Sequence, residues 1–303
     1  MPVTVKGDES ITLQSGKYGI RLEADRNITL IAKDDNIINV TTKEGSSDDV
    51  GDGINVTENA GSTITLQGAN NTITVIGEHS DGIYTAEGSR TSIDLIANAN
   101  NGVNKITATN NGIDHRGNGD VILKAEKGQN IITADGGDGV RVDGIGNVTL
   151  TAKENTINAG DNGIQVAGGG TVNVTAKNGN NIITANTNGI YANIAYGGKV
   201  DEYDGGINKI NLSGKQGLIK VENKDSDVTG IYLNNWAQVD LNTNTPDSDK
   251  LEINAISEKG DSTGINVTAL NNWYAGGSII NTNSIKDFSI LAQTDNYSTI
   301  KYC

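Results

Sequence analysis

The sequence predicts an all-β fold, a right-handed parallel β-helix (solenoid) of about nine to ten three-stranded coils. Three observations predict it. A short phrase, glycine followed by an apolar–polar–apolar run, returns nine times along the 303 residues. Two further alternating runs follow most copies, so each period offers three short strands. Clusters of Gly, Asn and Asp separate the runs, as turns between strands require.

The glycine phrase sets the period of the chain. Successive copies lie 24 to 41 residues apart, a spacing typical of solenoids. Val140 replaces Ile in one copy. Because parallel crossovers within one sheet are almost always right-handed, stacked copies predict a right-handed coil. The copies begin at Gly19, Gly53, Gly82, Gly112, Gly139, Gly163, Gly189, Gly230 and Gly264.

The period that begins at Gly53 shows the three predicted strands, which lie at 54–56, 64–66 and 73–75. Their alternation has the period of two that buries one face of a strand. We therefore expect three parallel sheets around a narrow apolar column, and no helix. Residues 1–303 are interpreted as a single β-helix, a fragment of a longer protein, with longer loop-bearing coils at 189–277. Incomplete coils are expected at both ends of the sequence.

A column of asparagines is predicted to support the stack. One Asn precedes the third strand of six successive periods, and aligned amides would bond from coil to coil, as they do in cross-β stacks. An ordinary turn-forming role would also place Asn there. Both interpretations are structural. The six residues are Asn36, Asn71, Asn104, Asn130, Asn155 and Asn181.

Composition excludes several classes of function. The chain has a net charge of −14, whereas a surface that binds nucleic acid needs a track of basic residues, so we expect no nucleic-acid partner. The single cysteine, Cys303, excludes an internal disulfide and a cysteine metal cluster. Residues 136–139 begin a calcium-binding Gly-Gly-x-Gly-x-Asp turn, but Arg141 occupies the place of its aspartate. We therefore expect no metal and no cofactor.

Catalysis is not expected either. Polysaccharide lyases and glycoside hydrolases with this fold need carboxylates that converge on one exposed sheet. Along the outward positions of the predicted strands, the acidic residues Asp94, Asp114 and Asp240 are isolated. His79 lies in a turn, and alternation points His115 inward, where turn carbonyls would satisfy it. The outward positions of the first sheet read Arg21, Asn55, Tyr84, Asp114, Arg141, Gln165, Tyr191, Tyr232 and Asn266.

The best candidate binding site comes from aromatic residues in the last third of the chain. Tyr196 and Tyr203 lie in the longest insertion, and the tripeptide Asn-Asn-Trp occurs twice, at Trp236 and at Trp273, which Tyr274 follows. Insertions in solenoids often carry the binding face. Exposed aromatic rings suit a sugar ring or a protein hot spot. Alternatively, these rings fold onto enlarged turns and cap a small satellite core.

Repeats such as residues 81–84, 130–134 and 188–192 resemble passenger domains of Gram-negative type V autotransporter adhesins, which share a pertactin-like right-handed β-helix. The resemblance implies a virulence-associated protein on the bacterial cell surface or secreted, exported through an outer-membrane β-barrel that this sequence does not include. It implies attachment to a host-cell surface glycan or protein, or to another bacterial cell through self-association. Two alternatives remain: a carbohydrate-active β-helix enzyme and a purely structural stalk.

Overall fold

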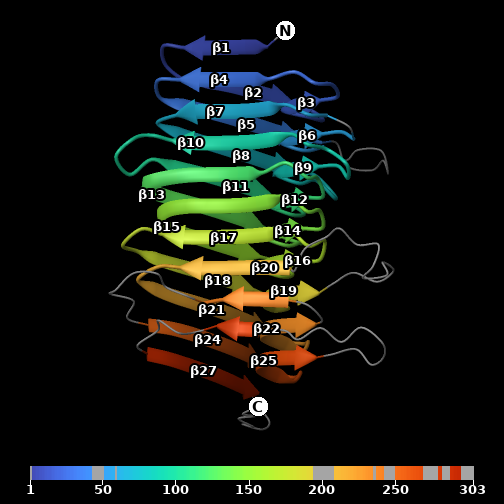
Figure 1. The fold of residues 1–303 in the computed structure, drawn as a ribbon, viewed down its shortest axis with the longest axis vertical. Coiled ribbons are helices and arrows are strands. Elements are labelled where there is room, and N and C mark those ends of the chain that lie inside the picture. The colour runs from blue at the N-terminus through green and yellow to red at the C-terminus, as the bar shows by residue number, and fades with distance from the viewer. Residues whose placement is uncertain are drawn as a thin grey trace.

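The computed structural model describes residues 2–42, 51–58, 60–193, 208–234, 237–241, 250–268, 279–281 and 287–294. Within these residues every regular element is a β-strand, as predicted, so none is a helix that could cross a membrane. All the strand pairings found there are parallel. The strands stack along one long axis, with β1 at one end and β27 at the other (Figure 1). This arrangement is consistent with a parallel β-helix.

The nine glycine phrases form one sheet, which we call the glycine sheet. Its strands pair in chain order, and the first apolar residue of each phrase lies beside the next, as Ile54 does beside Ile83. The prediction that the phrase repeats as a strand is therefore confirmed. The strands are β3 (Ile20–Leu22), β6 (Ile54–Val56), β9 (Ile83–Thr85), β12 (Ile113–His115), β14 (Val140–Val142), β16 (Ile164–Val166), β19 (Asn188–Asn193), β22 (Val228–Asn234) and β25 (Ser262–Thr268).

The second and third runs of each repeat form two files within one 18-stranded sheet. The first file holds β1 (Val3–Gly7), β4 (Ile28–Ala32), β7 (Thr63–Gly68), β10 (Ser92–Ala97), β17 (Thr171–Ala176), β20 (Asn208–Ser213), β23 (Ala237–Asp240) and β26 (Ile279–Asn281). The second file holds β2 (Ile11–Ser15), β5 (Asp35–Thr41), β8 (Asn70–Ile76), β11 (Val103–Ala108), β18 (Asn180–Ala185), β21 (Gln216–Asn223), β24 (Lys250–Ser257) and β27 (Asp287–Thr294).

Two long strands join these files, so the prediction of three separate sheets is corrected. β13 (Val121–Ala134) and β15 (Asn147–Ala159) each run through both files. Their pairing shifts register between Ala125 and Gln129, where a β-bulge or similar irregularity interrupts the ladder. A bulge bends a strand without ending it, which lets one strand serve both files.

The core is a column of branched aliphatic side chains. In the repeat that begins at Gly53, Ile54, Ile64 and Ile73 are all fully buried, one from each predicted strand. Their neighbours in each strand face outward, as the burial pattern of β7 shows. Burying each such side chain contributes roughly 1.5–3 kcal/mol relative to leaving it exposed. The predicted inward register is confirmed, including at Ile164, which is fully buried.

Close packing between repeats explains why the phrase begins with glycine. A β-carbon on Gly82 would lie 2.2 Å from Cγ2 of Ile106 and 2.5 Å from the backbone oxygen of Gly112. A β-carbon on Gly163 would meet Ile183 at 2.3 Å in the same way. Any side chain there would collide with the backbone of the next repeat, and glycine is the one residue without a β-carbon.

The asparagine ladder is confirmed. Each amide Nδ2 donates to the Oδ1 of the next asparagine at 2.8–2.9 Å, from Asn36 through to Asn181. At the last rung, Nδ2 of Asn181 donates to the carbonyl oxygen of Ser213 at 2.8 Å. The six asparagines lie inside the second-file strands rather than just before them, and all are buried. The column is structural, as expected.

Candidate functional site

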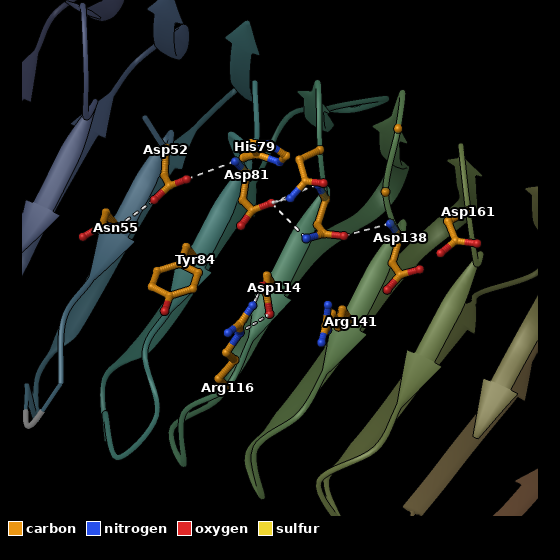
Figure 2. Close-up of a pocket in the computed structure, with 14 residues that line it drawn as sticks. Asp52, Asn55, His79, Asp81, Tyr84, Asp114, Arg116, Asp138, Arg141 and Asp161 are labelled. Atoms are coloured by element: carbon orange, nitrogen blue, oxygen red, sulfur yellow. Dashed lines mark hydrogen bonds and ion pairs between the residues drawn. The ribbon is translucent and has the colours of Figure 1, made fainter. Parts of the chain in front are cut away.

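A polar pocket of about 550 Å³ extends over several repeats of the glycine sheet (Figure 2). Its lining comes from the outward positions of β6, β9, β12 and β14, from the turns that precede β6, β9, β12, β14 and β16, and from Arg116 directly after β12. The lining residues are Asp52, Asn55, His79, Asp81, Tyr84, Asn110, Asn111, Asp114, Arg116, Gly136, Gly137, Asp138, Arg141 and Asp161.

One wall of the pocket is the outward column predicted from the alternation of the first sheet. Asn55 lies beside Tyr84, Tyr84 beside Asp114, and Asp114 beside Arg141. The register follows from the buried residues on either side of each outward one, such as Ile83 and Thr85 around Tyr84, because a shift by one residue would turn the column inward. These outward positions therefore come together as predicted.

The other wall is a ladder of Asp and Asn residues, each directly before the glycine of a phrase. The side-chain Oδ1 of one residue accepts a hydrogen bond from the backbone amide of the next. Asp81 donates to Asp52 at 3.0 Å, Asn111 to Asp81 at 2.9 Å, and Asp138 to Asn111 at 2.8 Å. These bonds satisfy backbone amides in the turns and fix the side chains at the pocket edge.

This wall corrects the expectation that acidic residues are isolated. Asp52, Asp81 and Asp138 line one pocket together with Asp114 and Asp161. The prediction considered outward positions within the strands, whereas three of these aspartates occupy the turn position before the glycine. The recurring Asp-Gly and Asn-Gly dipeptides could have revealed the column, because residues at one position of a repeat stack when the repeats do.

Both arginines of the pocket are held by carboxylates two residues away. Arg116 donates from Nε to Oδ1 of Asp114 at 3.0 Å and from an Nη to Oδ2 at 2.7 Å. Its guanidinium also lies 5.5 Å from the centre of the Tyr84 ring. Arg141 pairs with Asp143 in a similar way, at 2.7 Å from Nε. Each arginine therefore has its charge matched locally.

Burial disfavours the charged form of the ladder aspartates and so raises their pKa values. Burial, followed by the nearby charge of Asp114, raises the pKa of Asp81 to about 7. Burial likewise raises the pKa of Asp138 to about 6, and it raises the pKa of Asp52 above its usual range. A carboxyl group whose pKa lies near 7 can donate or accept a proton near neutral pH, and its oxygens accept hydrogen bonds from hydroxyl groups.

His115 does not take part in this pocket. It is fully buried, its Nε2 lies 2.8 Å from the carbonyl oxygen of Gly119, and its Nδ1 lies 2.7 Å from Oγ1 of Thr85. Because a carbonyl only accepts, Nε2 carries the proton and Nδ1 accepts from the threonine hydroxyl. Burial lowers the pKa of the imidazole. The expectation of an inward histidine bonded to a turn carbonyl is confirmed, whereas His79 lines the pocket from its turn.

The aromatic site predicted from the sequence stays a prediction. Tyr196, Tyr203, Trp236, Trp273 and Tyr274 all lie outside the described residues. Nearby on the outward column, Tyr191 and Tyr232 stack with ring centroids 5.2 Å apart and planes 8° from parallel. Stacked in this way, each ring covers one face of the other.

No group of His, Cys, Asp or Glu in the described part of the chain is arranged to hold a metal ion. Comparison with known proteins adds no assignment: no family, no curated protein and no solved structure matches this chain.

Proposed function

We propose that the chain is part of a bacterial adhesin, a passenger-type right-handed β-helix of about nine to ten coils that is displayed on the cell surface or secreted. In this proposal the polar pocket on the glycine sheet binds a glycan of a host cell or of another bacterium. The observation that carries the proposal is the pocket itself, in which Asp, Asn, Arg and Tyr side chains from successive repeats face one open space (Figure 2).

The chemistry of the lining suits sugar hydroxyls. Carboxylate oxygens accept hydrogen bonds, and asparagine amides both donate and accept them. Tyr84 adds an aromatic surface of the kind that packs against a sugar ring. Parallel strands lie about 4.8 Å apart, close to the length of one pyranose unit. Consecutive units of an oligosaccharide that runs along the long axis would therefore meet equivalent positions of consecutive repeats.

The test compares three proteins on a glycan array and on epithelial cells. A pocket variant, Tyr84→Ala with Asp161→Ala, alters the lining without touching the hydrogen-bonded ladder. A second variant, Trp236→Ala with Trp273→Ala, alters the aromatic site predicted from the sequence. We expect the pocket variant to lose about tenfold or more in affinity, the scale of one or two lost polar contacts.

The outcomes separate the possibilities. Binding lost only in the tryptophan variant would move the site to the late insertions and keep the adhesin. No binding by the unaltered protein would refute glycan adhesion and favour a stalk or self-association, which sedimentation would distinguish. Far-UV circular dichroism of each variant would control for loss of the fold.

A second candidate function is cleavage of a glycan. The observation that favours it is the pKa of Asp81, about 7, beside the carboxylates of Asp52 and Asp114. Glycoside hydrolases use one protonated carboxyl group as the acid and a second, ionised one as the base or nucleophile. Incubation with oligosaccharides and mass spectrometry of the products decides the question. Cleavage that Asp81→Asn abolishes would establish an enzyme, whereas retained binding without cleavage would leave the adhesin.

A further inference from the structure

The charge of the pocket, together with two carboxylate oxygens that accept no hydrogen bond from the described residues, indicates a ligand class. We propose that the pocket selects an oligosaccharide of amino sugars with free, protonated amines, whose ammonium groups bind Oδ2 of Asp81 and Oδ2 of Asp138. This inference rests on the proposed glycan-binding function and deepens it.

The charged side chains that line the pocket are mostly acidic. Three aspartates of the ladder and the nearby Asp161 form what we call the acidic wall, and no lysine is among the described residues that line the pocket; the four are Asp52, Asp81, Asp138 and Asp161. Both pocket arginines are already bonded to carboxylates of their own. In the described part of the chain, none of the four wall aspartates forms an ion pair. Among the described residues, no basic side chain is therefore bonded to any of these four aspartates.

Two carboxylate oxygens of the ladder take no part in its hydrogen bonds. Asp81 is 5% exposed and Asp138 is 4% exposed, yet both line the pocket. Oδ1 of Asp81 accepts from Asn110 and Asn111, and Oδ1 of Asp138 accepts from Asn162. Within the described residues, Oδ2 of either aspartate accepts no hydrogen bond. Both oxygens remain accessible from the pocket, so a hydrogen-bond donor on a ligand can reach them.

An ammonium group supplies both hydrogen-bond donors and the missing positive charge, and bonds of this charge-assisted kind are about twice as strong as neutral ones. An acetylated amine supplies one neutral N–H and no charge. A uronic acid or a sulfated sugar would bring further negative charge toward the four aspartates and be repelled.

Asp81 and Asp138 precede β9 and β14, with β12 between them in the sheet, so their carboxylates lie about 10 Å apart along the axis. That separation corresponds to two pyranose units. An oligomer that carries an amine on every unit can engage both oxygens at once, and two linked contacts raise affinity more than either alone. This favours a repeating amino sugar over a single amine.

The experiment is calorimetric titration of the full chain near neutral pH with three probes: a glucosamine hexamer, the same hexamer fully N-acetylated, and a lysine hexapeptide. We expect the glucosamine hexamer to bind about tenfold or more tightly than the acetylated one. The double variant Asp81→Asn with Asp138→Asn keeps the shape of both side chains and should abolish that preference. Asp94→Asn, which removes a charge from β10 of the other sheet, should leave it unchanged.

Each result decides something. Equal affinity for both hexamers, or a preference that survives the double variant, would overturn the amino-sugar assignment while glycan binding stands. A lysine peptide that binds as tightly as the glucosamine hexamer would replace the sugar with a generic cationic ligand and also overturn it. If neither hexamer binds and the glycan array is blank, the proposed function itself fails. Circular dichroism of the double variant checks that the fold survives.

Discussion

Removing one rung of the asparagine ladder tests whether these buried amides stabilise the fold. Asn155, in β15, accepts a hydrogen bond from Nδ2 of Asn130 and donates one to Oδ1 of Asn181, both at 2.9 Å. Its side chain is almost fully buried, at 1% exposure. Asn155→Ala deletes both bonds in a region that water does not reach.

The expected loss follows from what remains unpaired. Nδ2 of Asn130 keeps a second acceptor, the carbonyl oxygen of Leu123 at 3.1 Å, so this donor is not left unpaired and adds little to the loss of stability. Oδ1 of Asn181 loses the donor that the ladder gave it. The two lost bonds cost about 1 kcal/mol each, and the unsatisfied buried acceptor costs about 1–3 kcal/mol. Together they reduce the free energy of unfolding by about 3–5 kcal/mol.

Asn158→Ala is the matched control, because Asn158 lies three residues along the same strand with its side chain outward and partly exposed. We expect this change to alter stability by less than about 0.5 kcal/mol. Urea titration followed by far-UV circular dichroism gives both values, provided that the slope is unchanged between variants. Equal midpoints for the two variants would refute the reasoning, since the ladder would then contribute no net stability.

Four further predictions use the same assays. Gly82→Ala forces a β-carbon against Ile106 and should destabilise the fold by several kcal/mol, whereas Gly16→Ala, with no atom closer than 4.0 Å, should cost little. Ile164→Asp buries an unpaired charge in the core; melting like the unaltered protein would show that the inward register is wrong. Because folding raises the pKa of Asp81 from 3.8 to about 7, its stabilisation is full at low pH and is lost as pH rises through that window. Asp81→Asn should therefore gain stability over the unaltered protein as pH rises, and an unchanged difference from acid to neutral pH would contradict this. Burial lowers the pKa of His115 below 6.5, so stability should fall as pH drops below that value, and His115→Val should remove this loss from the pH titration.

The sequence was sufficient to predict the strands and their stacking, because both depend on local alternation and on a repeat. Each glycine phrase places an inward isoleucine or valine and an outward polar residue, and stacking then sets the register of Tyr84 beside Asp114. The asparagine ladder was predictable for the same reason. The joining of the two files at β13 and β15 was not, because a bulge of a few residues resembles a turn in the sequence.

The pocket was missed because its acidic wall lies in turns rather than in strands. Asp81 and Asp138 look like ordinary turn formers, and their burial depends on the turns of neighbouring repeats. Burial is the main cause of the raised pKa of Asp81, and the charges of Asp114 and Asp52, about 30 positions away in the sequence, raise it further. Sequence periodicity identifies such columns only when every position of the repeat is compared, including those outside the strands.

The direction of the hydrogen bonds has a mechanical consequence. Strands bond to their neighbours along the long axis, so a pull applied between β1 and β27 would load those bonds in tension, one layer after another (Figure 1). Repeats would therefore unfold one after another from an end of the stack, rather than all at once. Each repeat of 24 to 41 residues would release a contour length of about 80–150 Å. In the proposed adhesin, such stepwise lengthening under flow would limit the peak force on the bound ligand.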